Sequence, residues 1–143
     1  EHAHRLSCSE GCARCCMDGL TVFEVEAQVI RHHYDDLLRE GLAHPEGRCA
    51  FLDSAGSCRV YAHRPYVCRT QGLPLRWLDF SDDDEIVEYR DICELNEEGT
   101  PIEELDPASC WTLGTVEEKL SSLQAQVSSG EMRRVALREL FDK

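Results

Sequence analysis

The stretch that most constrains this fold reads Cys8-Ser9-Glu10-Gly11-Cys12-Ala13-Arg14-Cys15-Cys16, which places four thiols within nine residues. Five more cysteines follow, at Cys49, Cys58, Cys68, Cys93 and Cys110. Thiolates are soft, anionic ligands, and a group packed this closely is typical of proteins that hold a soft metal ion or an iron–sulfur cluster. The cysteines therefore indicate metal chemistry, and they predict a fold organised around metal-bearing loops.

A disulfide framework is the main alternative use of so many cysteines, and three features argue against it. A chain of 143 residues can build its own hydrophobic core and does not need cross-links to fold. Nine cysteines cannot all pair within one chain, and a bond between the adjacent Cys15 and Cys16 would be strained. Metal ligation is favoured over disulfides and over redox thiol exchange.

The charge of the chain excludes several classes of partner. Its 28 acidic and 15 basic residues give a formal net charge of −13, which repels phosphate backbones and anionic lipids. We therefore expect neither nucleic-acid nor membrane binding, and the acidic surface favours solubility over a docking role. The chain contains no apolar run near the ~20 residues that span a bilayer. Without a recognisable export signal, so many thiols favour the reducing cytoplasm.

The first half of the chain predicts a loop, a helix and a hairpin. Residues 7–19 read as an irregular loop that ends at the turn signal Asp18-Gly19. A capping-box pattern at Thr21–Glu24 predicts a helix over residues 21–40, with a buried stripe of Val22, Val25, Val29, Ile30 and Leu37. Residues 49–53 and 58–61 predict a short hairpin around the turn at 54–57. Pro65 then leaves Cys68 on a loop or in the first turn of a short helix.

The second half predicts another hairpin and a C-terminal helix. Residues 75–80 and 86–90 form the hairpin arms on either side of an acidic turn, and residues 96–110 form an ordered connection. A second capping box at Thr115 opens a helix over residues 115–141, bent near residues 128–130. We expect a small α+β protein with Cys-rich loops, short hairpins and a few helices. It would be one domain over 1–143, with a metal-binding core at 8–95 and a helical segment at 112–143.

The spacing of the cysteines predicts how they share a site. Cys8, Cys12 and Cys15 converge whether their segment is a helix or a loop, whereas the side chain of Cys16 should point elsewhere. Later cysteines supply further thiolates, so that the candidate ligands are Cys8, Cys12, Cys15, Cys16, Cys49, Cys58, Cys68 and Cys93. Eight thiolates suffice for two four-thiolate sites or one polynuclear site. Cys110 reads as a buried free thiol.

Three stretches resemble the YkgJ-type cysteine-cluster family, which is described as zinc- or iron-chelating. They are Cys8–Cys16, then Cys49-Ala50-Phe51-Leu52-Asp53 with Cys58-Arg59-Val60-Tyr61, and then Arg64-Pro65-Tyr66-Val67-Cys68-Arg69. The larger flagellin lysine N-methylases carry a similar cluster, and that resemblance implies an iron–sulfur centre. Because this chain has no Gly-rich loop after a strand to bind S-adenosylmethionine, methylation does not carry over.

The identity of the metal is left open by these residues, with a slight preference for iron–sulfur over Zn²⁺ and copper(I) far behind. Arg64 and Arg69 lie beside candidate ligands and are candidates to stabilise thiolates. The sequence predicts a metal-binding protein that has no recognisable catalytic constellation of its own. The alternative is an iron–sulfur-dependent enzyme component in protein modification or electron transfer, which would have a protein partner.

Overall fold

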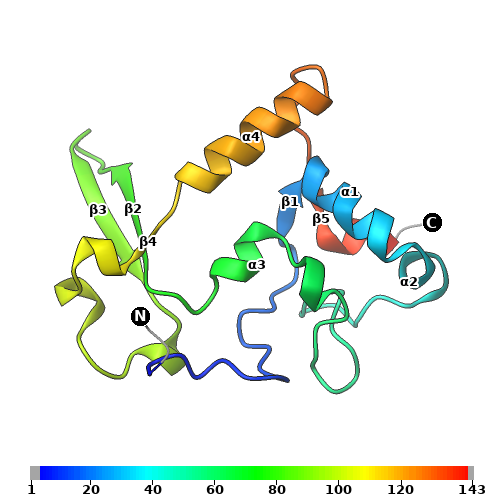
Figure 1. Ribbon diagram of the computed structural model, residues 1–143, viewed down its shortest axis with the longest axis horizontal. Helices are drawn as coiled ribbons and strands as arrows, with labels where there is room; N and C mark the ends of the chain where they lie inside the picture. Colours follow the sequence, from blue (N-terminus) through cyan, green and yellow to red (C-terminus); the bar gives the residue numbers. More distant parts are fainter. Residues whose placement is uncertain (1–3, 142–143) are drawn as a thin grey trace. The chain divides into compact units, whose positions relative to one another are not determined.

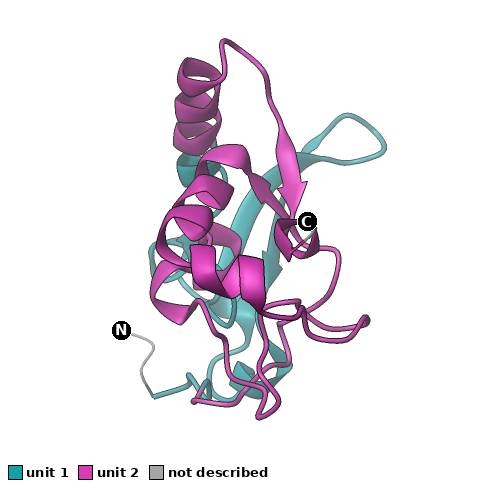
Figure 2. Ribbon diagram, turned by 90° about the vertical axis from the view of Figure 1, so that its right-hand side faces the viewer, with its two compact units in different colours: residues 1–8, 70–117 teal, residues 9–69, 118–143 magenta. Residues whose placement is uncertain are grey.

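The computed structural model describes residues 4–141 and combines helices with two small sheets, which confirms the α+β class (Figure 1). The chain divides into two compact units (Figure 2). Unit 1 contains the N-terminal residues up to Cys8 together with Thr70–Glu117, and unit 2 contains Ser9–Arg69 with Glu118 onward. Within the described residues, no helix has the length and apolar character needed to cross a membrane.

Unit 2 is built from helices around a two-stranded sheet. Strand β1 (Thr21–Phe23) pairs antiparallel with β5 (Arg134–Ala136), with Val22 opposite Val135. The helices are α1 (Glu24–His33), α2 (Asp35–Glu40), α3 (Tyr66–Thr70) and most of α4 (Thr115–Val127), with 3₁₀ helices at Tyr61–His63 and Leu137–Phe141. Strand pairing therefore joins two segments that lie more than a hundred residues apart in the sequence.

The predicted helix over residues 21–40 is wrong at its start and in its middle. Residues 21–23 belong to β1, because pairing with β5 takes up a segment that the local capping pattern assigned to the helix. The carboxylate of Glu26 accepts a hydrogen bond from the Phe23 amide at 3.2 Å, so the start of α1 is shifted by two residues. Tyr34 adopts a non-helical backbone and separates α1 from α2.

The predicted helix over residues 115–141 is correct only in its first half. Helix α4 ends at Val127, and a turn with left-handed Ser129 and Gly130 leads into β5. Residues 137–141 then form a 3₁₀ helix, and the last two residues of the predicted helical segment, 142–143, lie outside the described range. The apolar residues after Gly130 thus fill a strand and a 3₁₀ helix.

The hydrophobic core of unit 2 differs from the predicted stripe. Helix α1 buries Ala27 and Ile30, whereas Val29 is 44% exposed. The other buried apolar residues come from the cysteine-bearing loops, both β-strands, α2 and the C-terminal 3₁₀ helix: Ala13, Val22, Leu38, Cys49, Ala50, Phe51, Leu52, Val60, Val135, Leu137, Leu140 and Phe141. The cysteine-bearing loops are therefore part of the core.

Unit 1 is organised around a three-stranded sheet with the order β3-β2-β4. Strands β2 (Leu75–Phe80) and β3 (Ile86–Asp91) form the hairpin that the sequence predicted, and β4 (Trp111–Thr112) pairs parallel with the start of β2. The connection contains 3₁₀ helices at Glu94–Asn96, Ile102–Glu104 and Pro107–Ser109.

Candidate metal centre

The first cysteine cluster lies on an irregular loop, as predicted for residues 7–19. Turn hydrogen bonds shape it, from the Cys12 amide to Ser9 O and from the Cys16 amide to Ala13 O, at 3.0 and 3.1 Å. Ala13 is buried in the core of unit 2. That contact anchors the middle of the loop, and Cys16 packs against the same core.

The segment with Cys49 and Cys58 is a tight loop in place of the expected pair of strands. It forms one antiparallel bridge, between Leu52 and Cys58. The Asp53 side chain accepts hydrogen bonds from the amides of Ala55 and Ser57, at 2.9 and 2.8 Å, and so satisfies the turn locally. The Cys49 amide donates to Cys16 O at 3.0 Å, which fixes this loop against the first cluster.

Cys68 lies in the first turn of α3, one of the two placements that the sequence allowed after Pro65. The Cys68 amide donates to Pro65 O at 3.0 Å. At the start of the helix, the Tyr66 amide donates to the Glu26 carboxylate at 2.8 Å. Glu26 therefore connects the start of α1 to the helix that carries Cys68.

The thiols of Cys15 and Cys16 interact directly. A hydrogen bond between these two side chains is the largest influence on both, and it lowers the pKa of Cys15 to about 6 and raises the pKa of Cys16. The expectation that Cys16 would point away is therefore wrong. It assumed helix or strand geometry, whereas the loop turns at this point with a hydrogen bond from the Met17 amide to Cys15 O.

Five thiols of unit 2 lie close enough for their charges to affect one another. Burial first, and then the charges of Cys49, Cys58 and Cys15, raise the pKa of Cys68 to about 12. Burial also raises the pKa of Cys49 and of Cys58. The charges of Cys49 and Cys58 contribute to the raised pKa of Cys16. The structure thus brings together Cys15, Cys16, Cys49, Cys58 and Cys68.

Arg64 is the cation that acts on most of these thiols. Its charge lowers the pKa of Cys15, Cys58 and Cys68, in each case less than the leading cause. Its guanidinium also lies over the Tyr61 ring, 3.7 Å from the ring centroid. Arg69 instead donates to backbone oxygens of Ala62 and Arg64, both at 2.8 Å, and these hydrogen bonds stabilise the turn before α3.

The donor set fits a soft metal by its chemistry. Within the described residues, which include all nine cysteines, every cysteine is a free thiol. In residues 4–141, however, no three histidine, cysteine, aspartate or glutamate side chains already surround a common point as metal ligands do. The thiols are gathered but not closed around an ion, so binding would require side-chain or loop adjustment.

Cys8 and Cys93 belong to unit 1, where they lie beside a buried asparagine. Asn96 is completely buried, and its amide nitrogen lies 3.6 Å from the Cys8 sulfur and 2.8 Å from Gly72 O. The side-chain oxygen of Asn96 accepts a hydrogen bond from the Ser7 backbone amide at 2.7 Å. The backbone amide of Asn96 donates to Cys93 O at 2.7 Å. Cys110 is buried in the same unit, as expected.

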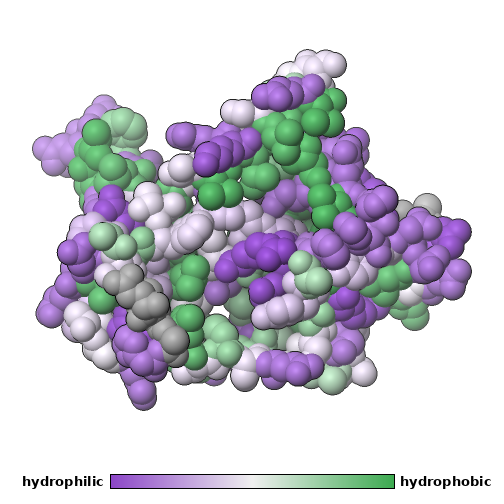
Figure 3. All heavy atoms as spheres, in the orientation of Figure 1, coloured by the Kyte–Doolittle hydropathy of each residue, from purple (hydrophilic) through white to green (hydrophobic). Residues whose placement is uncertain are grey.

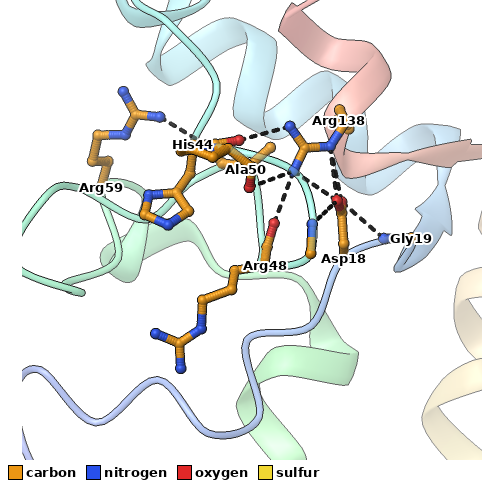
Figure 4. A network of polar contacts seen from close by, with 9 residues as sticks. Asp18, Gly19, His44, Arg48, Ala50, Arg59 and Arg138 are labelled. Atoms are coloured by element: carbon orange, nitrogen blue, oxygen red, sulfur yellow. Dashed lines mark hydrogen bonds and ion pairs between the residues drawn. The ribbon is translucent and has the colours of Figure 1, made fainter.

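An ion pair that the sequence did not predict ties the C-terminal 3₁₀ helix to the first cysteine loop (Figure 4). The Arg138 guanidinium donates to both oxygens of Asp18, from 2.8 to 3.1 Å, and to the carbonyl oxygens of His44 and Arg48, at 2.7 and 2.8 Å. Asp18 also accepts from the Gly47 amide. This contact lowers the pKa of Asp18 and raises that of Arg138.

This network, the Asp18–Arg138 clamp, fixes the chain immediately after Cys16 and immediately before Cys49. Only the Asp18-Gly19 turn was visible in the sequence. Its partner lies 120 residues away, and no local pattern marks Arg138 as different from other arginines. The clamp therefore shows how a segment remote in sequence can set the path of the cysteine loops.

A comparison with protein-family models matches residues 7–94 to the family CxxCxxCC, described as "Putative zinc- or iron-chelating domain". The chain belongs to this family. The match covers the eight candidate ligands and ends before the C-terminal segment that contains Arg138, and it confirms the cysteine-cluster resemblance. Membership supports metal binding, with zinc and iron both within the description of the family. No curated protein and no solved structure matches the chain.

Proposed function

We propose that this chain holds a metal centre through cysteine thiolates, with Cys15, Cys16, Cys49, Cys58 and Cys68 as its principal ligands. The observation that carries this proposal is the mutual electrostatic influence of these five thiols. Three segments contribute them, and the loop with Cys15 and Cys16 is joined to the loop with Cys49 and Cys58 by the hydrogen bond from the Cys49 amide to Cys16 O. Family membership supports the same chemistry.

A bound cation would replace protons on these thiols. Burial raises the pKa of Cys49, Cys58 and Cys68, so these thiols keep their protons when no cation is bound. Metal ligation requires thiolates, and binding therefore releases protons. The cost of burying several anionic ligands is offset by the metal and, in part, by the nearby positive charge of Arg64.

Cys12, Cys8 and Cys93 complete the proposed ligand set. Cys12 lies in the same loop as Cys15 and Cys16, whereas Cys8 and Cys93 lie in unit 1 near Asn96. The six candidate thiolates of unit 2 alone exceed the four that one tetrahedral ion or one iron–sulfur cluster needs. The proposal assigns no ligand role to Cys110 or Arg69.

We favour an iron–sulfur cluster over zinc as the bound centre. Iron–sulfur clusters tolerate irregular cysteine spacing, and the CxxxCxxCC pattern has such spacing. Zinc in a closed four-thiolate site would be structural and would add directly to the free energy of unfolding. An iron–sulfur cluster would instead support electron transfer, or a reaction carried out together with a partner enzyme. The positive charge of Arg64 would offset part of the negative charge of the cluster and its thiolates.

The deciding experiment is anaerobic purification followed by measurement of iron, zinc and acid-labile sulfide per chain. Iron with matching sulfide, and a visible absorption that dithionite bleaches, would support the iron–sulfur proposal and its electron-transfer alternative. Zinc without sulfide, in a colourless protein, would overturn the cluster and keep the thiolate metal centre. A folded chain that binds neither metal stoichiometrically would contradict metal binding altogether.

Single substitutions locate the ligands. Cys58→Ser and Cys68→Ser should each lower the metal content severalfold, because serine replaces a soft ligand with a poorer one. Cys110→Ser removes a buried thiol outside the proposed ligand set and should retain full metal content. Equal metal loss in all three variants would indicate general destabilisation and would contradict the ligand assignment.

A further inference from the structure

The β2–β3 hairpin of unit 1 carries an apolar patch that no described residue covers. Its members are Leu78, Phe80 and Ile86, with exposed fractions of 60, 67 and 68%. Phe80 and Ile86 are directly opposite in the antiparallel register, and Leu78 lies two residues from Phe80 on the same face. These three residues are called the hairpin patch, and Figure 3 shows hydrophobic surface over the β2–β3 hairpin.

Elsewhere on the hairpin, an aromatic stack and two ion pairs hold side chains together. On the opposite face, Trp77 and Tyr89 stack with ring centroids 5.7 Å apart. On the face of the hairpin patch, nearer the base, Glu88 pairs with Arg76 and Arg90, at 3.5 and 2.6 Å. The patch therefore holds the most exposed apolar side chains of the hairpin, because the next, Tyr89, is only 39% exposed.

The β3 edge of the hairpin has no second strand beside it in the described sheet, although near Arg90 it packs against the 3₁₀ helix at Ile102–Glu104. Strand β3 is an edge strand, because in the described sheet its only partner is β2. Such an edge can accept an extended segment through main-chain hydrogen bonds, with side-chain specificity supplied by alternate residues. Ile86 begins this strand, so an added strand would lie beside the hairpin patch.

A strong negative charge borders the patch. The turn that joins the two strands consists of Ser81 followed by Asp82, Asp83, Asp84 and Glu85, and these four acidic residues are exposed. Asp79 adds a further exposed carboxylate on β2. An apolar surface with an acidic border is complementary to a segment that alternates apolar and cationic side chains.

We propose that the β2–β3 hairpin docks an extended, cationic and apolar segment of a partner protein against Leu78, Phe80 and Ile86. A second copy of this chain is the poorer occupant, because each copy carries a net charge of −13 and would bring another acidic turn to the interface. The same charge disfavours nucleic acid and anionic lipid. This docking role is independent of which metal the cysteines bind.

The test uses the full metal-loaded chain and a fluorescent eight-residue peptide of alternating lysine and valine, with binding followed by anisotropy. The peptide should bind, and its affinity should fall as salt is raised, because cationic residues face the acidic turn. Phe80→Ser combined with Ile86→Ser should weaken binding at least tenfold. A separate variant, Asp82→Asn with Asp83→Asn, should weaken it and flatten the salt dependence.

Matched controls separate docking from general attraction to an acidic protein. Leu42→Ser alters an exposed leucine in unit 2 and should bind the peptide as the wild type does. A lysine–serine peptide should bind at least tenfold more weakly than the lysine–valine peptide. Metal content and circular dichroism equal to the wild type establish that each hairpin variant is folded.

Three results would overturn the proposal. The first is peptide binding that folded hairpin variants leave unchanged, and the second is equal binding of the lysine–serine and lysine–valine peptides. The third is self-association of the wild type, measured by sedimentation, that Phe80→Ser abolishes. That last result would assign the hairpin patch to a second copy of the chain.

Discussion

At the scale of single residues, Gly72 shows how closely the chain approaches a candidate ligand. Its backbone has a φ of +89°, and a Cβ added to it would lie 2.8 Å from the Cys8 sulfur and 3.1 Å from the Asn96 amide nitrogen. Asn96 in turn donates to the carbonyl oxygen of Gly72. The absence of a side chain at Gly72 thus makes room for both neighbours.

Gly72→Ala should lower the free energy of unfolding more than the replacement by alanine of another glycine that also has a positive φ but has open space around it. Gly114→Ala is the matched control in unit 1, because its φ is +109° and its added Cβ meets no atom within 4 Å. We expect about 1–2 kcal/mol loss for Gly114→Ala from the left-handed backbone, and about 1–3 kcal/mol more for Gly72→Ala from overpacking. Urea unfolding measures both, and equal losses would contradict the close approach.

At the scale of elements, the Asp18–Arg138 clamp joins the C-terminal 3₁₀ helix to two cysteine loops. Arg138→Ala would leave Asp18 and several carbonyl oxygens without their donor, and we expect a loss of about 1–3 kcal/mol in unfolding free energy. Arg138→Lys should recover only part of it, because lysine lacks the planar fork of donors. Metal release to a chelator should be faster than in the wild type in both variants, and faster in Arg138→Ala than in Arg138→Lys.

Arg39→Ala provides the control for the clamp. Arg39 also forms ion pairs, with Asp35 and Asp36, but its side chain is 61% exposed and the pairs lie within one helix. Such surface pairs contribute little, so we expect a change below about 0.5 kcal/mol and unchanged metal release. A loss in Arg39→Ala as large as that in Arg138→Ala would contradict a special role for the clamp.

A second contact between elements makes the junction of α1 and the 3₁₀ helix at Tyr61–His63 sensitive to pH. The rings of His33 and His63 stack at 3.8 Å between centroids, and the Tyr34 hydroxyl lies 3.0 Å from Nδ1 of His63. Partial desolvation, followed by the charges of His63 and His32, lowers the pKa of His33. Protonation of His33 is therefore harder in the folded chain than in the unfolded chain.

The free energy of unfolding should consequently fall as the pH drops below about 6.5, the ordinary histidine pKa, and level off below the lowered value. His33→Asn should flatten the part of this dependence that comes from His33. The measurement is the difference in urea midpoint between wild type and variant from pH 8 to pH 5. A difference that stays constant across this range would contradict the prediction.

The elements also show what the sequence could predict. The β2–β3 hairpin and the cysteine loop follow from local turn residues and alternation, and both were predicted. The short helix with Cys68 was one of the two placements that Pro65 left open. Strands β1 and β5 were missed because each is only three residues long and is defined by its distant partner. The capping pattern at Thr21 placed the start of its helix three residues early, whereas the helix predicted from Thr115 begins at that residue.

In the candidate site, too, local features could be predicted from the sequence and long-range contacts could not. Chemistry and spacing made the cysteines candidate ligands, and that role stays a prediction. The approach of Cys15 to Cys16 was not predicted, because loop geometry does not follow helix or strand rules. Gln124 was likewise missed: α4 buries this residue, and its side-chain oxygen accepts a hydrogen bond from the Val25 amide. Residues that act through contacts a hundred positions away leave no local pattern.

At the scale of the whole molecule, the net charge of −13 opposes compaction. Because salt screens repulsion between exposed carboxylates, the free energy of unfolding should rise between 0.05 and about 0.5 M sodium chloride. Potassium chloride at the same ionic strength should have the same effect, since screening does not depend on the cation. Urea unfolding checks this prediction, and a decrease with either salt would show that attractive ion pairs outweigh the repulsion.

Unit 2 combines an early part of the chain, residues 9–69, with a late part that begins at residue 118, and this affects how the unit forms during synthesis. On the ribosome, Asp18 is made 120 residues before Arg138, a delay of roughly 6–24 seconds at ~5–20 residues per second. During that interval the early thiols are already synthesised, and the arginine that will hold their loops is not. Nascent chains would therefore pass through a stage in which the cysteines are exposed to oxidants and to competing metals, and chaperones or a reducing environment would protect them until translation ends.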